Sequence, residues 1–227
     1  MRKMMILIIF LLSIFTILSS FVSATYATPI INDVGLPNAP VIITFDELVP
    51  PPPDGTAITN QYANLGVTFS PGVYYDSQGP VTGIPGISGH YIGNFYQDFT
   101  NWTLPTNNPF SILFNTPQIE AAIGFATNLG ATTTLTALLN GTVVETFTLS
   151  TTYNNPATAF LGFTFIGTDI SFDEISISVT TDDYGLHLAL VDTIQDCTTV
   201  PVPEPATIFL LGSGLLGVGW LMRKRTA

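Results

Sequence analysis

Basic residues are absent from almost the whole of this 227-residue chain. All five lie at the two ends, and none lies between positions 4 and 222. Fifteen of the sixteen acidic residues fall between Asp33 and Asp196. Because nucleic-acid binding depends on Lys and Arg side chains that neutralise phosphates, this composition excludes nucleic acid as a partner. The acidic surface would either attract cations or simply keep an exported protein in solution.

Cysteine is also scarce, with Cys197 as its one representative. An intrachain disulfide and a Cys-based zinc cluster are therefore excluded. A lone thiol is either idle or free to form an intermolecular bond, and we favour the idle thiol. Charged residues make up 9% of the chain and hydrophobic residues 46%, which argues against a disordered acidic protein.

The first residues have the pattern of a secretory signal. Arg2 and Lys3 precede an apolar run over residues 4–22, and small residues at 22–24 and 25–27 offer two cleavage sites. We therefore expect a signal peptide over residues 1–27, with an uncleaved anchor as the alternative. No cysteine lies near the cleavage region, which excludes lipoprotein processing.

A second apolar segment covers residues 206–222 and contains no charge. As a helix it would extend about 25 Å, slightly less than a ~30 Å hydrocarbon core. The basic residues Arg223, Lys224 and Arg225 follow it and form a stop-transfer signal, since positive residues prefer the cytoplasm. Both ends thus predict the same topology, in which the acidic middle of the chain lies outside.

Pro203, Glu204 and Pro205 stand immediately before this segment. A Pro-Glu-Pro motif, a glycine-containing transmembrane helix and a short basic end, in this order, resemble the sorting tail of the PEP-CTERM family, here over residues 200–227. The resemblance implies that an exosortase, a membrane-embedded cysteine transpeptidase, recognises the motif and processes the tail. It implies an inner-membrane-anchored precursor that is then released to the cell surface or the extracellular space. A bare membrane anchor is the alternative.

Residues 28–199 form the predicted extracytoplasmic domain, which consists of short strands separated by turn residues. Asn140-Gly141 lies between two strand-like segments, 132–139 and 142–149, and is a strong hairpin signal because both residues accept a positive φ. Residues 119–126 alternate in the manner of a half-buried strand. Further strands are expected at 41–45, 66–70, 110–114, 159–165, 174–179 and 186–193. This pattern predicts an all-β, antiparallel sandwich of the jelly-roll type.

The connections of this domain are expected at 49–55 and 75–89, and residues 25–40 are expected to be a loose lead. The domain also resembles the lumenal domain common in PEP-CTERM proteins through the segments VIITFDEL, ITNQYANLGVTFS, IEAAIGFAT and LHLALVDTI. Because this sorting family accompanies exopolysaccharide production, the resemblance implies a non-enzymatic structural or adhesive role in exopolysaccharide or biofilm.

Catalytic groups are few. Ser88 and His90 lie in a segment close to a nucleophile elbow, but the last glycine of G-x-S-x-G is missing. The other histidine, His187, falls in an expected strand. We therefore predict that the protein is not an enzyme, and a hydrolase that uses Ser88 and His90 is the least favoured alternative.

Acidic residues at the ends of the domain suggest a structural calcium site. Asp46 and Glu47 end the first expected strand, and Asp192 lies in the last one. Jelly-roll carbohydrate-binding modules often hold one calcium ion between these strands, and calcium prefers six to eight oxygen ligands. The alternative is that Asp46 caps a strand end and Asp192 bonds to the backbone.

Aromatic residues gather over positions 74–102 among Gly, Asn and Gln. Aromatic rings can stack on the apolar faces of sugar rings, so Tyr96 and Trp102 are the candidates for a glycan-binding face. The alternative is that these aromatics are ordinary core. A carbohydrate-binding module with a structural calcium ion is accordingly the second functional reading.

Overall fold

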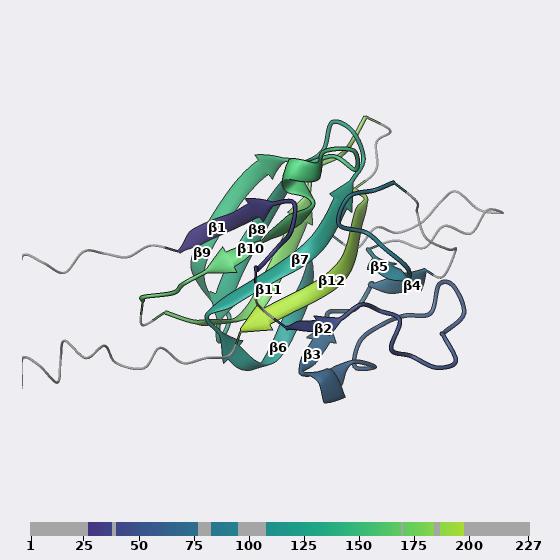
Figure 1. Ribbon diagram of the computed structural model, residues 1–227, viewed down its shortest axis with the longest axis horizontal. Coiled ribbons are helices and arrows are strands. Elements are labelled where there is room, and N and C mark those ends of the chain that lie inside the picture. Colours follow the sequence, from purple (N-terminus) through teal and green to yellow (C-terminus); the bar gives the residue numbers. More distant parts are fainter. Residues whose placement is uncertain are drawn as a thin grey trace, which may run out of the picture.

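The computed structural model describes residues 27–37, 40–76, 83–94, 108–168, 170–183 and 187–197, which form a two-layered β-sandwich (Figure 1). The predicted signal segment and the sorting tail lie outside these ranges. Within them, no helix is long and apolar enough to cross a membrane.

Two antiparallel sheets face each other across the sandwich. One has seven strands, in the order β1-β10-β7-β12-β5-β4 with β2 also paired to β12, and the other has the order β3-β6-β11-β8-β9. The strands are β1 (Thr28–Asn32), β2 (Val41–Ile43), β3 (Val67–Phe69), β4 (Tyr74–Asp76), β5 (Tyr91–Gly93), β6 (Phe110–Gln118), β7 (Glu120–Thr127), β8 (Thr132–Leu139), β9 (Thr142–Ser150), β10 (Phe160–Thr164), β11 (Phe172–Val179) and β12 (Ala189–Cys197).

The central strands have jelly-roll topology. Four of them are ordered β2-β12-β7-β10 and the facing four β6-β11-β8-β9. The chain passes from one sheet to the other at almost every connection from β6 to β12, and the first strand of this set, β2, pairs with the last, β12. This arrangement confirms the predicted jelly roll. It also brings the first and last of these eight strands together.

Alternating side chains build the core. In β8 and β11 every second residue is buried, while the threonines and serines between them face outward. Phe163, Phe165 and Phe172 form the aromatic centre of the interior, with ring centroids 5.6 to 6.3 Å apart. At about 25 cal/mol per Å² of buried apolar surface, such side chains supply most of the free energy that holds the two sheets together.

Strand β7 differs from its prediction as a half-buried strand, because seven of its eight residues are buried. Two segments cover its outer face: Ile30 and Leu36 pack on Ala122, and the loop over residues 83–90 lies on the rest of the strand. A Cβ atom added to Gly124 would overlap the backbone oxygen of Gly86 in that loop. Glycine at position 124 therefore lets the loop lie directly on the sheet.

Three short strands were not predicted. β1 lies in the expected loose lead, where it pairs with β10 over five residues. β4 and β5 lie around the expected loop at 75–89 and pair with each other. Each has three to five residues, too few for a period-two pattern to appear in the sequence. β1 and β5 are held by the distant strands β10 and β12, whereas β4 is held by β5 and by a bridge between Tyr74 and Ala57.

The β8–β9 hairpin is confirmed, with positive φ at both turn residues, Asn140 (50°) and Gly141 (74°). The register shifts in this hairpin, since Ala137 pairs with Glu145 and Leu138 with Val143. Val144 is therefore the extra residue of a bulge, and it packs against the core. The bulge explains why Glu145 interrupts the inward-facing row of β9.

Candidate functional site

The strongest polar cluster lies where the loop over residues 83–90 meets β12. Asp192 is fully buried in β12, beside a register shift at Thr193, whose φ is 40°. Its carboxylate accepts hydrogen bonds from the backbone N–H of Ser88 (2.6 Å), the Ser88 hydroxyl (3.3 Å) and the backbone N–H of Thr193 (2.6 Å). One buried carboxylate thus fastens the loop to the sheet.

Burial makes this carboxylate unusual. Removal from water disfavours the charged form and raises the pKa of Asp192 to about 6, and the negative charge of Asp46 acts in the same direction. The hydrogen bonds from Ser88 and Thr193 lower the pKa and offset part of this effect. Asp192 is therefore a carboxyl group that takes up a proton at mildly acidic pH.

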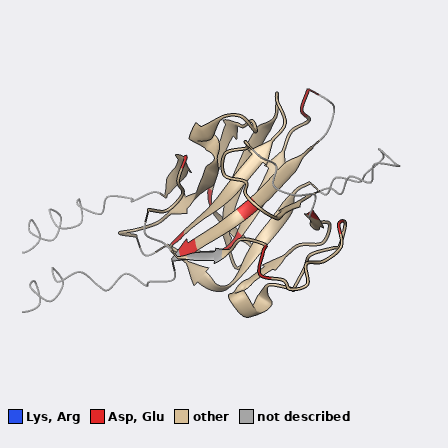
Figure 2. Cartoon of the chain, turned by 45° about the vertical axis from the view of Figure 1, so that its right-hand side comes forward, with Lys and Arg blue, Asp and Glu red and all other residues tan. Residues whose placement is uncertain are grey.

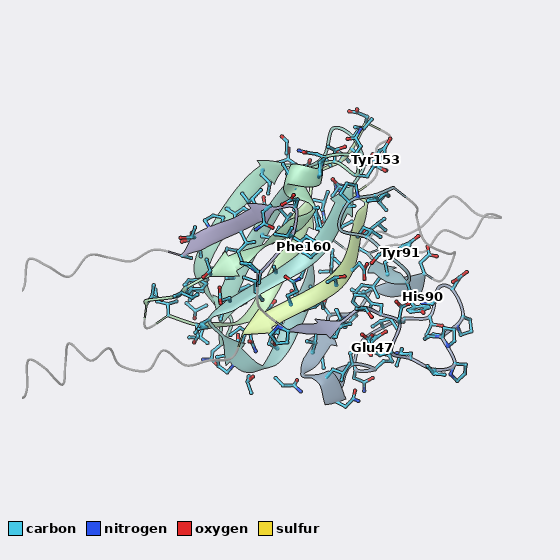
Figure 3. All side chains as sticks on the ribbon, in the orientation of Figure 1. Glu47, His90, Tyr91, Tyr153 and Phe160 are labelled. Carbon is cyan, nitrogen blue, oxygen red and sulfur yellow. The ribbon has the colours of Figure 1, made fainter. Side chains whose placement is uncertain are left out.

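A second carboxylate, Asp46, holds the far end of the same loop. It contacts Nδ1 of His90 and accepts a longer hydrogen bond, 3.4 Å, from the His90 backbone N–H. Gly89 lies so close that an added Cβ would be 2.8 Å from Asp46 Oδ2. The His90 ring stacks on Tyr75 with centroids 5.4 Å apart. Figure 3 places His90 beside β4 and β5, with Glu47 nearby.

Two buried tyrosines lie beneath this pair. Burial, and next the charge of Asp46, raise the pKa of Tyr75 to about 12. Its hydroxyl is buried and has no hydrogen-bond partner among the described residues. The Tyr62 hydroxyl donates to the carbonyl of Phe45, 3.3 Å away. Burial, followed by the charge of Glu47, raises the pKa of Tyr62 as well.

The structure brings together two of the three acids proposed as calcium ligands. Asp46 and Asp192 bind the same loop, whereas the Glu47 carboxylate accepts hydrogen bonds from the backbone N–H (2.6 Å) and hydroxyl (2.9 Å) of Thr44. Within the described ranges, no group of three or more His, Cys, Asp and Glu side chains is placed to hold a metal ion. For Asp192, the bonds match the alternative role of backbone partner. Calcium binding stays a prediction.

The residues of the hydrolase alternative are close in sequence but have different partners. The Ser88 hydroxyl donates to Asp192, while His90 contacts Asp46. A catalytic serine would instead donate to the histidine that removes its proton. The Asp46–His90 pair escaped sequence reasoning because 44 residues separate its members. No local signal could have found it.

A pocket of about 290 Å³ lies beside the start of the same loop, with Ile84 of the loop and Leu190 of β12 in its wall. Its walls are mainly apolar, with Thr127 and Asn128 as polar groups and Tyr153 as a partly exposed aromatic ring. The lining residues are Ile84, Ala126, Thr127, Asn128, Tyr153, Leu188 and Leu190. Figure 3 shows Tyr153 well away from His90 and Glu47.

The predicted glycan-binding residues, Tyr96 and Trp102, lie outside the described residues. Tyr75 and Tyr91, from the same aromatic stretch, are buried and belong to hydrophobic clusters. For these two, the alternative of ordinary core is correct.

Comparison with known families identifies the sorting signal. Residues 201–225 match the PEP-CTERM protein-sorting motif. The chain carries a PEP-CTERM sorting motif. The match includes Pro203, Glu204 and Pro205 and the stop-transfer residues Arg223, Lys224 and Arg225. No curated protein matches the chain.

This PEP-CTERM protein is therefore an exosortase-sorted protein that is exported through the membrane to the cell surface. The charge of its described domain agrees with the sequence, since Figure 2 shows acidic residues and no Lys or Arg among the residues in colour. The sorting signal and the polar cluster belong to different parts of the chain. The motif indicates where the protein is sorted, and its function at that place has to be sought in the β-sandwich.

Proposed function

We propose that this PEP-CTERM protein is a non-enzymatic structural or adhesive component of an exopolysaccharide or biofilm matrix. The observation that carries the proposal is the combination of a sorting motif with a jelly-roll domain. Sorting to the surface presents the sandwich to extracellular polymer. β2 and β12, the first and last strands of the jelly roll, are paired, which suits a domain that must persist without an intrachain disulfide.

The polar cluster supports a structural role over a catalytic one. Asp192 and Asp46 both accept hydrogen bonds from the loop over residues 83–90. The Ser88 hydroxyl donates its hydrogen bond to the buried carboxylate of Asp192. A hydrolase needs a nucleophile with a free path to substrate and a base within reach. Substituting Ser88 or His90 should therefore lower the free energy of unfolding and should not remove a hydrolytic activity.

The sorting step predicts processing at both ends. The precursor should be held by the segment at residues 206–222 and then lose both this tail and the signal over residues 1–27. Intact-mass spectrometry of protein released from the cell surface should give a mass without the two ends. Cells that lack the exosortase provide the control, in which the tail stays attached. If the tail is still attached in cells with an active exosortase, it serves only as a membrane anchor and is not processed.

Carbohydrate binding is the second candidate, and the pocket beside Tyr153 favours it. Its volume of about 290 Å³ is near the lower end for ligand pockets, which suits a small unit such as one sugar ring. The Tyr153 ring offers a stacking face, and Asn128 supplies polar atoms for hydroxyl groups. Because no basic residue lies between positions 4 and 222, the expected glycan is neutral.

A glycan array with the purified protein tests this candidate. If the pocket binds sugar, Tyr153→Ala should weaken binding about tenfold, which corresponds to the loss of one stacking contact. Tyr96→Ala and Trp102→Ala examine the sites that the sequence suggested. Val143→Ala is the control, because it also removes an exposed apolar side chain but lies outside the pocket. Binding that survives all three aromatic substitutions would remove aromatic stacking as its basis.

A further inference from the structure

Strand β9 forms an open edge of its sheet, since its only partner among the described strands is β8. An edge strand presents unpaired backbone N–H and C=O groups that can pair with another chain. The other edge strands are short: β2, β3 and β4 have three residues each, and β1 has five, including Pro29. β9 has nine residues and contains neither proline nor lysine.

The outward-facing groups of this edge can be assigned. Thr146 pairs with Thr136 of β8, but its backbone N–H donates to the carboxylate of Glu145, 2.9 Å away. This N–H therefore points away from β8. Because such groups alternate along a strand, the backbone groups of Thr148 and Ser150 face the same open side. The edge offers a row of three residues for pairing.

Charge is scarce along the β8–β9 hairpin, although the Asp173 carboxylate of β11 accepts a hydrogen bond from the Asn140 N–H at its turn. Between positions 121 and 168 the single charged residue is Glu145. Its carboxylate folds back on its own strand and occupies the first outward N–H of the row. The Glu145 carboxylate therefore competes with any incoming strand for the hydrogen bond of the Thr146 N–H.

We infer that the open edge of β9 pairs with β9 of a second copy of this chain, in antiparallel register centred on Phe147. Every other charged surface of one copy would meet acid with acid, because the domain carries no basic residue. In this register Glu145 faces Leu149 of the second copy. The two Glu145 residues then lie about four residues apart along the strands, roughly 13 Å, which exceeds the ~8 Å Debye length at physiological salt.

The same register is self-complementary in side chains. Thr146 of each copy lies opposite Thr148 of the other, on the outer face of the sheet. Within one copy, β8 and β9 already use such pairs: Thr134 and Thr148 hydroxyls are 2.9 Å apart, and the Thr146 hydroxyl donates to Thr136 over 3.2 Å. A second β9 would continue this row of threonine contacts across the new strand pair.

The contact should be weak. Pairing of two nine-residue edges buries less than the roughly 800 Å² per partner of a stable interface. Association at low affinity becomes effective when many copies are held close together, as they would be on a cell surface. This last step rests on the proposed function, but the pairing itself does not.

Sedimentation velocity of the full chain in density-matched detergent, over a range of concentrations, tests the pairing. Glu145→Ala frees the Thr146 N–H for the incoming strand, so self-association should tighten about fivefold. Thr148→Pro removes an N–H that β8 does not use, so the fold should persist while self-association is lost. Thr136→Ala changes the same outer face one strand away from the edge and should associate like the original chain.

All variants share the apolar ends, so any association through those ends is the same in each. Self-association that is unchanged in Glu145→Ala would overturn the inference, and this holds even if Thr148→Pro fails to fold. Equal association of Thr148→Pro and the original chain, with matching thermal unfolding, would overturn it too. The sorting result by mass spectrometry is independent, so a failure of one does not imply a failure of the other.

Discussion

Acidification from pH 7 to pH 5 should stabilise the β-sandwich by about 1 kcal/mol through Asp192 alone. The folded pKa of about 6 lies above the ordinary value of 3.8, so the folded state holds the proton more tightly than the unfolded state. The stabilisation is fully present below the unfolded pKa and is lost as the pH rises through 6. Thermal unfolding at the two pH values should show a rise in Tm of about 3 °C at the lower pH.

Asp192→Asn identifies the source of this dependence. The amide keeps an oxygen for the Ser88 N–H and carries no charge, so the difference between pH 5 and pH 7 should shrink by about 1 kcal/mol. Burial also raises the pKa of Asp196, which leaves a dependence of the same sign in this variant. Asp33→Asn removes one charge at an exposed position and serves as the control. An equal loss of pH dependence in both variants would mean that general charge repulsion, and not Asp192, is responsible.

Gly124→Ala should destabilise the domain by about 3 kcal/mol, near the upper end of overpacking effects. The new Cβ would overlap the backbone oxygen of Gly86, and backbone cannot move aside as a flexible side chain can. The loop over residues 83–90 must then lift from β7, which also loosens the bonds of Ser88 to Asp192. Urea unfolding with a linear extrapolation measures the loss.

Gly141→Ala is the matched control for this substitution. Gly141 has a φ of 74°, and an added Cβ would have nothing within 4 Å, so its cost is that of the left-handed conformation alone, about 1 kcal/mol. Gly124→Ala measures the cost of the contact between the new Cβ and the loop, and Gly141→Ala measures the cost of a positive φ. If the two variants lose the same stability, the close approach of the loop to the sheet is not what requires glycine at position 124.

The fold was predictable to the extent that its signals are local. β8, β9 and their turn follow from alternating residues on either side of Asn140-Gly141, and the jelly roll follows from the number and spacing of such strands. The double burial of β7 was not predictable, because it depends on a loop from 30 to 40 positions earlier in the chain. β1 and β5 were missed for the same reason, because pairing with the distant strands β10 and β12 defines them. β4 was missed because its three residues are defined by pairing with β5, which was itself missed.

The site was predictable only in part. Pairing of the first and last strands of the jelly roll was expected to bring Asp46 close to Asp192, and both carboxylates do bind one loop. Glu47 was placed with them because it follows Asp46 in sequence, but the nearby Thr44 takes its carboxylate. The partners Ser88 and His90 could be singled out by residue type, yet which carboxylate each would meet depends on how the loop crosses the sheet.

The absence of Lys and Arg from positions 4 to 222 has a consequence for survival outside the cell. Proteases of the trypsin type cleave after these two residues, because an aspartate in their specificity pocket requires a basic side chain. Once its ends are removed, the protein offers such enzymes no bond to cut, even when it unfolds. The same property hides it from routine tryptic peptide mapping, so a protease that cleaves at acidic residues is needed to detect it in matrix extracts.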